Sequence, residues 1–199
     1  NSTVSKLRKA TDTREALALF REHSREELQS DLDFTAEVFG KAVNGFMNEN
    51  LRELRKVLTA VEEKKIHLKQ VKRVGTLGVT QLDHDIAVEK GLYYYQGNDF
   101  ASEIIFSIRR LAEPLKDHID NNFSPLSPVQ KDDFGKVSEQ IISFLRNCAT
   151  MIRKNDYIGF EELIAESITL MNQLTALKKG ELKRIQGPVS YTHLTLPTI

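Results

Sequence analysis

The chain has 199 residues, with 28 basic and 28 acidic side chains and a formal net charge of zero. This is near the usual size of one domain, and a hydrophobic share of 40% is too high for wholesale disorder. A neutral chain produces no overall field that would attract nucleic acid, so we expect no nucleic-acid partner.

The single cysteine, Cys148, excludes an intrachain disulfide framework and a cysteine-based zinc cluster, and it fits a reducing compartment. No uninterrupted apolar stretch approaches the roughly 18 residues that a transmembrane helix requires. The first residue is Asn1 and no secretory signal follows it, so we expect the natural start to lie upstream.

The composition changes at Pro188, after which residues 188–199 contain no Asp, Glu, Lys or Arg. Its first seven residues, PVSYTHL, resemble the translation of a transposase-end oligonucleotide of the kind used as a sequencing adapter. We therefore expect residues 188–199 to lie outside the native fold and assign no function to Tyr191 or His193. The alternative is an ordinary polar tail.

The first predicted helix begins near Thr13, because Asp12 and Glu15 have the spacing of a capping box. A second helical stripe ends around residues 48–50, with apolar positions at Leu28, Leu32, Phe39, Ala42 and Phe46.

Helical periodicity then continues from Leu51 to Ile86 and predicts one long helix that passes Gly75 and Gly78. We expect these glycines to mark a close approach to a neighbouring helix, with a break as the alternative. Beyond Gly91 a buried stripe is predicted, with Pro114 kinking the helix rather than ending it: Phe100, Ile104, Ile108, Leu111, Leu115 and Ile119.

The two prolines between Ser124 and Pro128 predict a loop, and Ser127 with Gln130 predicts a capping box for the helix that follows. Its expected apolar stripe is Phe134, Val137, Ile141, Phe144, Leu145, Cys148 and Ile152. Asn155 and Asp156 are predicted to end this helix and cap the last one, whose stripe is Phe160, Leu163, Ile164, Ile168, Met171, Leu174 and Leu177. The sequence thus predicts an all-α fold, an antiparallel bundle of about five helices.

None of the histidines His23, His67, His84 and His118 forms the Glu-x-x-His pair of di-iron bundles. His67, the dipeptide His84–Asp85, and Asp120 resemble the scattered ligands of HD-type metal phosphohydrolases. A lone His–Asp pair is a weak signal, and we expect solvated helix residues and no catalytic residue.

Two sets of acidic residues have the spacing of helical neighbours: Asp83, Asp85 and Glu89, and Asp99 with Glu103. They could hold a hard cation, but exposed acidic helix faces are commoner, so no metal ligand is assigned.

A basic stretch could meet phosphate, an anionic lipid or an acidic partner segment: Lys64, Lys65, Lys69, Lys72 and Arg73. A solvated face is the expected reading. Tyr93, Tyr94 and Tyr95 span too much of a helix to share one face, so at least one should have a buried ring and a hydrated hydroxyl.

The segment Glu89–Ser124, which contains LYYYQGNDF, resembles a PhoU-like domain together with Asn50–Leu58 and Asn155–Ala165. The likeness is to the cytosolic helical region that follows the membrane portion of bacterial inorganic phosphate transporters of the Pit permease family. It covers about Thr11 to Gln186. Family members continue into a further helix, so the resemblance implies that residues 12–187 form a bundle without its last helix. It also implies that residues 1–11 are a linker from an upstream region.

The resemblance implies a non-catalytic regulatory or assembly domain of an inorganic phosphate transmembrane transporter, at the cytoplasmic face of the inner membrane. Its expected partner is the membrane portion of the same transporter, no cofactor is implied, and an oligomer remains open. PhoU proteins carry acidic metal-cluster motifs, of which only Asp99 matches here, so no metal ligand is transferred. The alternatives are a stand-alone PhoU-like adaptor in phosphate signalling and the HD-type hydrolase.

Overall fold

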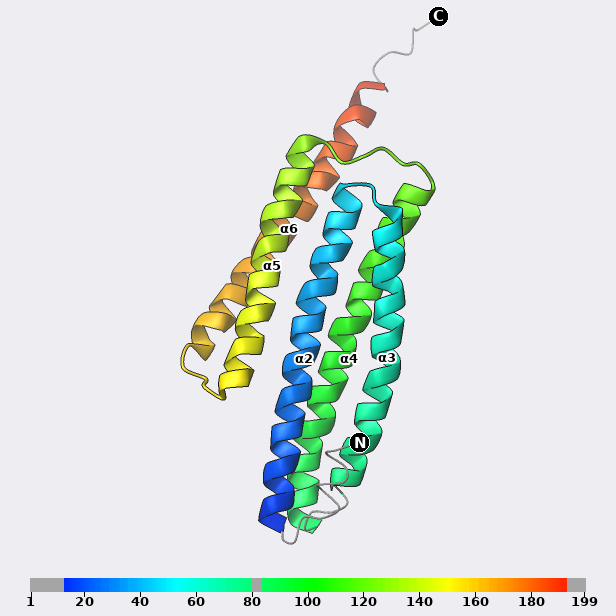
Figure 1. The fold of residues 1–199 in the computed structure, drawn as a ribbon. Helices are drawn as coiled ribbons and strands as arrows, with labels where there is room; N and C mark the ends of the chain where they lie inside the picture. Colours follow the sequence, from blue (N-terminus) through cyan, green and yellow to red (C-terminus); the bar gives the residue numbers. More distant parts are fainter. Residues whose placement is uncertain (1–12, 80–83, 193–199) are drawn as a thin grey trace, which may run out of the picture.

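The computed structural model describes residues 13–79 and 84–192, except for the side chains of residues 13, 74, 77–79, 85–90, 92, 93 and 185–192. Its secondary structure consists of five helices and no strands within these ranges: α2 (Thr13–Met47), α3 (Leu51–Val79), α4 (His84–Asp120), α5 (Pro128–Lys154) and α6 (Phe160–Thr192). Successive helices run in opposite directions, which confirms the predicted all-α antiparallel bundle (Figure 1). None of the described helices is both long and apolar enough to cross a membrane.

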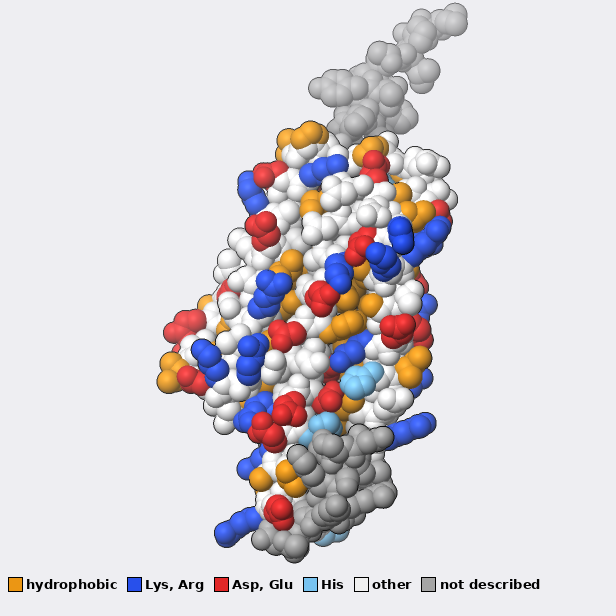
Figure 2. All heavy atoms as spheres, in the orientation of Figure 1, with side chains coloured by type: hydrophobic (Ala, Val, Ile, Leu, Met, Phe, Trp, Pro, Cys, Tyr) orange, Lys and Arg blue, Asp and Glu red, His pale blue; other side chains and the backbone are white. Residues whose placement is uncertain are grey.

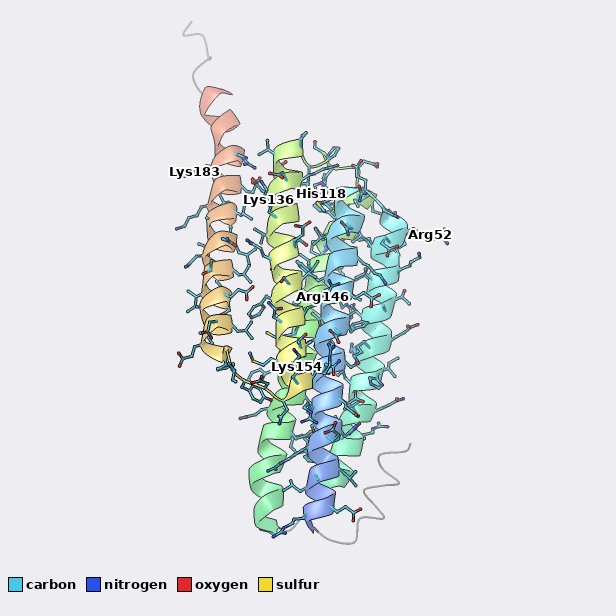
Figure 3. The ribbon with its side chains drawn as sticks, turned by 60° about the vertical axis from the view of Figure 1, so that its left-hand side comes forward. Arg52, His118, Lys136, Arg146, Lys154 and Lys183 are labelled. Atoms are coloured by element: carbon cyan, nitrogen blue, oxygen red, sulfur yellow. The ribbon has the colours of Figure 1, made fainter. Side chains whose placement is uncertain are left out.

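Helix α2 is the centre of the assembly because it contacts α3, α4 and α5. Helices α3 and α4 also pack against each other, so α2, α3 and α4 form a three-helix unit. In the described part of the chain, α6 packs against α5 alone and lies at the edge of the molecule (Figure 3). The α2–α3–α4 side of the bundle is therefore closed by mutual contacts, whereas the α6 side has a helix with only one neighbour.

The main hydrophobic core lies inside the three-helix unit. It is built from Val38, Ala42, Leu54, Val57, Val61, Leu68, Ile105, Ile108 and Ala112. Leu54, Val57, Val61 and Ile105 are the largest fully buried side chains, and each contributes about 1.5–3 kcal/mol by leaving water. Two alanines of this core, Ala42 and Ala112, are completely buried and let the helix backbones approach closely.

The residues before Met47 form one helix, so the prediction of two successive helices was wrong. No glycine or proline interrupts residues 13–39, and the Ser24 hydroxyl bonds the Phe20 carbonyl within the helix at 2.8 Å. The predicted end at residues 48–50 is confirmed, with Glu49 in the left-handed region at φ 52°. The Asn50 side chain accepts from the backbone N–H of Glu53 and so opens α3.

The prediction of one helix from Leu51 to Ile86 was also wrong, because α3 ends at Val79 and α4 begins at His84. Leu82 and Asp83 lie outside the described residues. Gly75 does mark a close approach, since a Cβ there would fall 2.0 Å from the Tyr94 ring. Helix α4 continues through Pro114 to Asp120, so the proline does not end it.

The face predicted as buried on α4 is partly wrong. Phe100 and Ile104 are 67% and 37% exposed, whereas Ile105 is fully buried. The buried face runs through Ala101, Ile105, Ile108 and Ala112 because α4 packs against both α2 and α3. Ile108 is the member of the predicted stripe that this core buries most deeply.

Both predicted ends of α5 are confirmed. The Ser127 and Gln130 side chains form a reciprocal capping box, and Asn155 caps the other end in the left-handed conformation. Asp156 does not cap α6 as predicted, because it accepts from the N–H of Ile158 and α6 begins only at Phe160. The backbone of α6 passes Pro188 to reach Thr192, and the segment boundaries at residues 11 and 187 remain predictions.

Candidate interaction surface

The five residues of the predicted basic stretch do not form one patch. The Lys64 ammonium lies 2.6 Å from a carboxylate oxygen of Asp31 on α2 and is nearly buried, over the ring of Phe34. Lys65 pairs with Glu62 and lies over Phe106 of α4. Positive and negative side chains are interspersed over the face shown in Figure 2.

Lys72 also points toward α4, where its ammonium lies 3.0 Å from Asp99 and over the ring of Tyr95. Lys69 and Arg73 are exposed. The basic stretch therefore has three kinds of residue. Lys64 forms a buried ion pair, Lys65 and Lys72 contact α4, and Lys69 and Arg73 are exposed to solvent. Asp99, the one match to the acidic PhoU motif, is a partner of Lys72 in this structure.

The ion pair of Asp31 with Lys64 is the most buried charged contact among the described residues. Burial raises the pKa of Asp31, and the hydrogen bond from Lys64 opposes this rise. His67, one turn along α3, lies 3.2 Å from Glu27, one turn along α2. Sequence spacing could not reveal either contact, because the partners lie on different helices.

A pocket of about 450 Å³ with mixed polar and apolar walls lies beside this pair, between α2, α4 and the end of α5. Its charged lining consists of Arg21, Arg25, Glu27 and Asp31. Two cations and two carboxylates offset each other there, and Arg25 is paired with Glu22. The pocket therefore has no strong preference for an anion or a cation.

The structure separates the residues that resemble an HD-type metal site. His84 is the first residue of α4 and Asp120 the last, and a 37-residue helix is about 55 Å long. Asp120 pairs with Arg55, and His67 pairs with Glu27 on another part of the bundle. The Asp85 side chain lies outside the described part. His84 and Asp120 cannot bind one metal ion.

The acidic sets do not converge on a cation site in the described part of the chain. Glu103 pairs with Arg110 at 3.0 Å, as Asp99 does with Lys72, while Asp83 and the side chains of Asp85 and Glu89 are not described. Across the described residues, no group of three His, Cys, Asp or Glu side chains is arranged to hold a metal ion.

Cys148 and Tyr94 are the other chemically distinctive groups. Burial raises the pKa of the half-buried Cys148 thiol, which keeps it protonated and weakly nucleophilic. The Tyr94 ring is buried, as predicted for one tyrosine, and its hydroxyl donates to the Val71 carbonyl at 2.9 Å. The Tyr95 hydroxyl bonds Thr76, and the Tyr93 side chain lies outside the description.

An apolar groove of about 520 Å³ lies between α2, α4, α5 and α6 in the described part of the chain. We call it the apolar groove, and it is lined by Phe39, Val43, Phe46, Met47, Leu111, Leu115, Phe134, Val137, Ser138, Ile141, Leu174, Leu177, Lys178, Glu181 and Leu182. Most of these residues belong to the predicted helical stripes. The sequence signalled apolar faces there, but not that four helices would leave a space between them.

A second apolar feature continues from the groove along the N-terminal half of α6. The side chains of Phe160, Ile164, Ile168 and Met171 are between 45% and 67% exposed, although the sequence predicted that they would be buried. Leu170 is the one side chain that α6 buries in its described part. We call these four residues the α6 stripe, and it is exposed because α6 packs only against α5.

Comparison with known proteins identifies no relative. The chain matches no protein-family model, no curated protein and no solved structure.

Proposed function

We propose that this chain is a non-catalytic interaction domain, the cytoplasmic regulatory or assembly domain of an inorganic phosphate transmembrane transporter. The apolar groove is the observation that carries the proposal. A groove lined almost entirely by aliphatic and aromatic side chains has few groups for chemistry and a large surface for contact.

An amphipathic helix is the natural occupant of the groove. The lining comes from α2, α4, α5 and α6, and the sides of the groove are themselves long helices. A further helix laid along them would place its own apolar stripe against Phe134, Leu174 and Leu182, which are now 40–50% exposed. Lys178, which is exposed, would remain available for the polar side of that helix, whereas Glu181 already accepts from Gln130 and pairs with Arg184.

The link to phosphate transport rests on the likeness of Glu89–Ser124 to PhoU-like domains. In that setting the helix in the groove would come from the transporter itself, and its docking would change the rate of transport. The proposal needs no metal, cofactor or reacting group in this domain.

Phosphate uptake by cells that express the complete gene product tests the proposal. Leu174→Glu places a charge in the apolar groove and should alter uptake by severalfold, because a buried unpaired carboxylate opposes helix docking. Thr169→Glu is the matched control, since Thr169 is exposed and absent from the groove lining. Thermal unfolding of both variants would show whether the domain still folds.

Two results would contradict the proposal. One is a complete gene product that transports no phosphate, and the other is a folded Leu174→Glu variant whose uptake equals that of Thr169→Glu. A gene that encodes no membrane-spanning part would favour the stand-alone adaptor instead.

A further inference from the structure

The α6 stripe needs a partner of its own. Phe160, Ile164, Ile168 and Met171 follow one another at spacings of four, four and three residues, so they form one continuous ridge. None of them lines the apolar groove. An occupant of the groove would thus leave the N-terminal part of this ridge in water.

The charges that flank the ridge show what kind of helix fits it. Glu161 lies near the start of α6 and Lys179 about five helical turns later, so both occupy the same angular position beside the ridge. Both side chains are exposed. A helix that runs antiparallel and carries the same two charges would place its Lys179 opposite Glu161 and its Glu161 opposite Lys179.

We propose that a second copy of this chain covers the α6 stripe, with the two α6 helices packed antiparallel about a twofold axis. A twofold axis perpendicular to both helices brings identical flanks together, so each Glu161–Lys179 contact is made twice. A parallel pair would instead hold the two Glu161 side chains at the same height on opposite flanks, with no such pairing. The interface requires nothing from the phosphate-transport proposal.

The ridge supplies the apolar centre of this interface. Ile168 and Met171 lie midway between the two charged positions and would therefore lie close to the twofold axis. Phe160 would lie about 30 Å from its copy, near the C-terminal half of the partner's α6. Lys178 and Leu182 continue the ridge toward that half and also line the apolar groove, so a second copy and a helix in the groove would meet at these two residues.

Charge reversal measured by analytical ultracentrifugation tests the pairing. Glu161→Lys should weaken dimerisation by about tenfold, and adding Lys179→Glu should restore it. Glu162→Lys is the matched control, because it makes the same charge change in the same first turn but lies about 100° around the helix from Glu161. Equal weakening by Glu161→Lys and Glu162→Lys would overturn the proposal. A wild-type chain that stays monomeric at the highest concentration that the ultracentrifuge can measure would also overturn it.

Cysteine cross-linking tests the direction of the helices in a Cys148→Ser background. Met171→Cys should form a disulfide between copies, whereas Phe160→Cys should not. Efficient cross-linking at both positions would indicate a parallel pair and overturn the proposal. A longer natural chain that is monomeric and protects Met171→Cys from thiol reagents would show that a segment in cis covers the stripe, which would also overturn it.

Discussion

Gly75 of α3 lies against the ring of Tyr94 of α4, so closely that a Cβ at Gly75 would fall 2.0 Å from the ring carbons. The same ring packs 4.8 Å from the ring of Phe20, and its hydroxyl bonds the Val71 carbonyl. The glycine thus allows three helices to meet at one buried aromatic side chain.

Gly75→Ala should therefore destabilise the bundle by about 1–3 kcal/mol, because the buried ring must shift to admit a methyl group. In a Tyr94→Ala background the same substitution should stabilise the protein by up to about 1 kcal/mol, since alanine favours a helix more than glycine does. Urea unfolding of the wild type, the two single variants and the double variant measures both effects.

Gly135→Ala is the control for this pair, because nothing lies within 4 Å of a Cβ at that position of α5. It should be neutral or slightly stabilising. A destabilisation equal to that of Gly75→Ala would mean that the contact with Tyr94 is not the cause.

Ile105 and Ile104 are neighbours in sequence with different surroundings, since Ile105 is fully buried and Ile104 is 37% exposed. Ile105→Ala should cost about 2–5 kcal/mol by opening a cavity in the main core. Ile104→Ala should cost well under half as much. If chemical denaturation showed a larger loss of unfolding free energy for Ile104→Ala than for Ile105→Ala, the buried face of α4 would be the one that the sequence predicted.

Some features of the fold could be predicted from the sequence, and others could not. The capping box at Ser127 and the stop at Asn155 were predictable because each depends on a few adjacent residues. The buried face of α4 was not, because it depends on which helices surround α4 in space. The boundary between α3 and α4 was also missed, since apolar periodicity continues across it.

The apolar groove was likewise only partly predictable from the sequence. The apolar stripes of α5 and α6 were visible in the sequence, and several of their residues line the apolar groove. Periodicity identifies an apolar face but not whether another helix covers it. The pairing of Lys64 with Asp31 was hidden for a related reason, because the two residues belong to different helices.

The buried pair of Asp31 with Lys64 gives a third prediction. Asp31→Ala should cost about 3–5 kcal/mol because it leaves the Lys64 ammonium buried without a partner. The double variant Asp31→Leu with Lys64→Met removes both charges and should recover most of this loss. A double variant as unstable as Asp31→Ala alone would show that shape, not charge, determines the cost.

The same carboxyl gives a pH dependence. Burial raises the pKa of Asp31 above 3.8, so the folded chain retains a proton there that the unfolded chain has lost. The stabilising contribution of this proton is full below pH 3.8 and declines as the pH rises through the folded-state pKa. The free energy of unfolding of the wild type, relative to Asp31→Asn, should therefore be lower at pH 7 than at pH 4. The opposite order would mean that Lys64 lowers the pKa more than burial raises it.

Tyr94 should ionise late in an alkaline titration. Burial raises its pKa to about 12 from 10.0, because the phenolate would lie among apolar side chains. The stability that this group contributes is present below pH 10 and is lost as the pH rises from 10 to about 12, by up to about 3 kcal/mol. Tyrosinate absorbance should show a late step near pH 12 that disappears in Tyr94→Phe and in urea. Tyr157→Phe, at an exposed position, should leave the late step unchanged, and a late step that persists in Tyr94→Phe would assign it to another tyrosine.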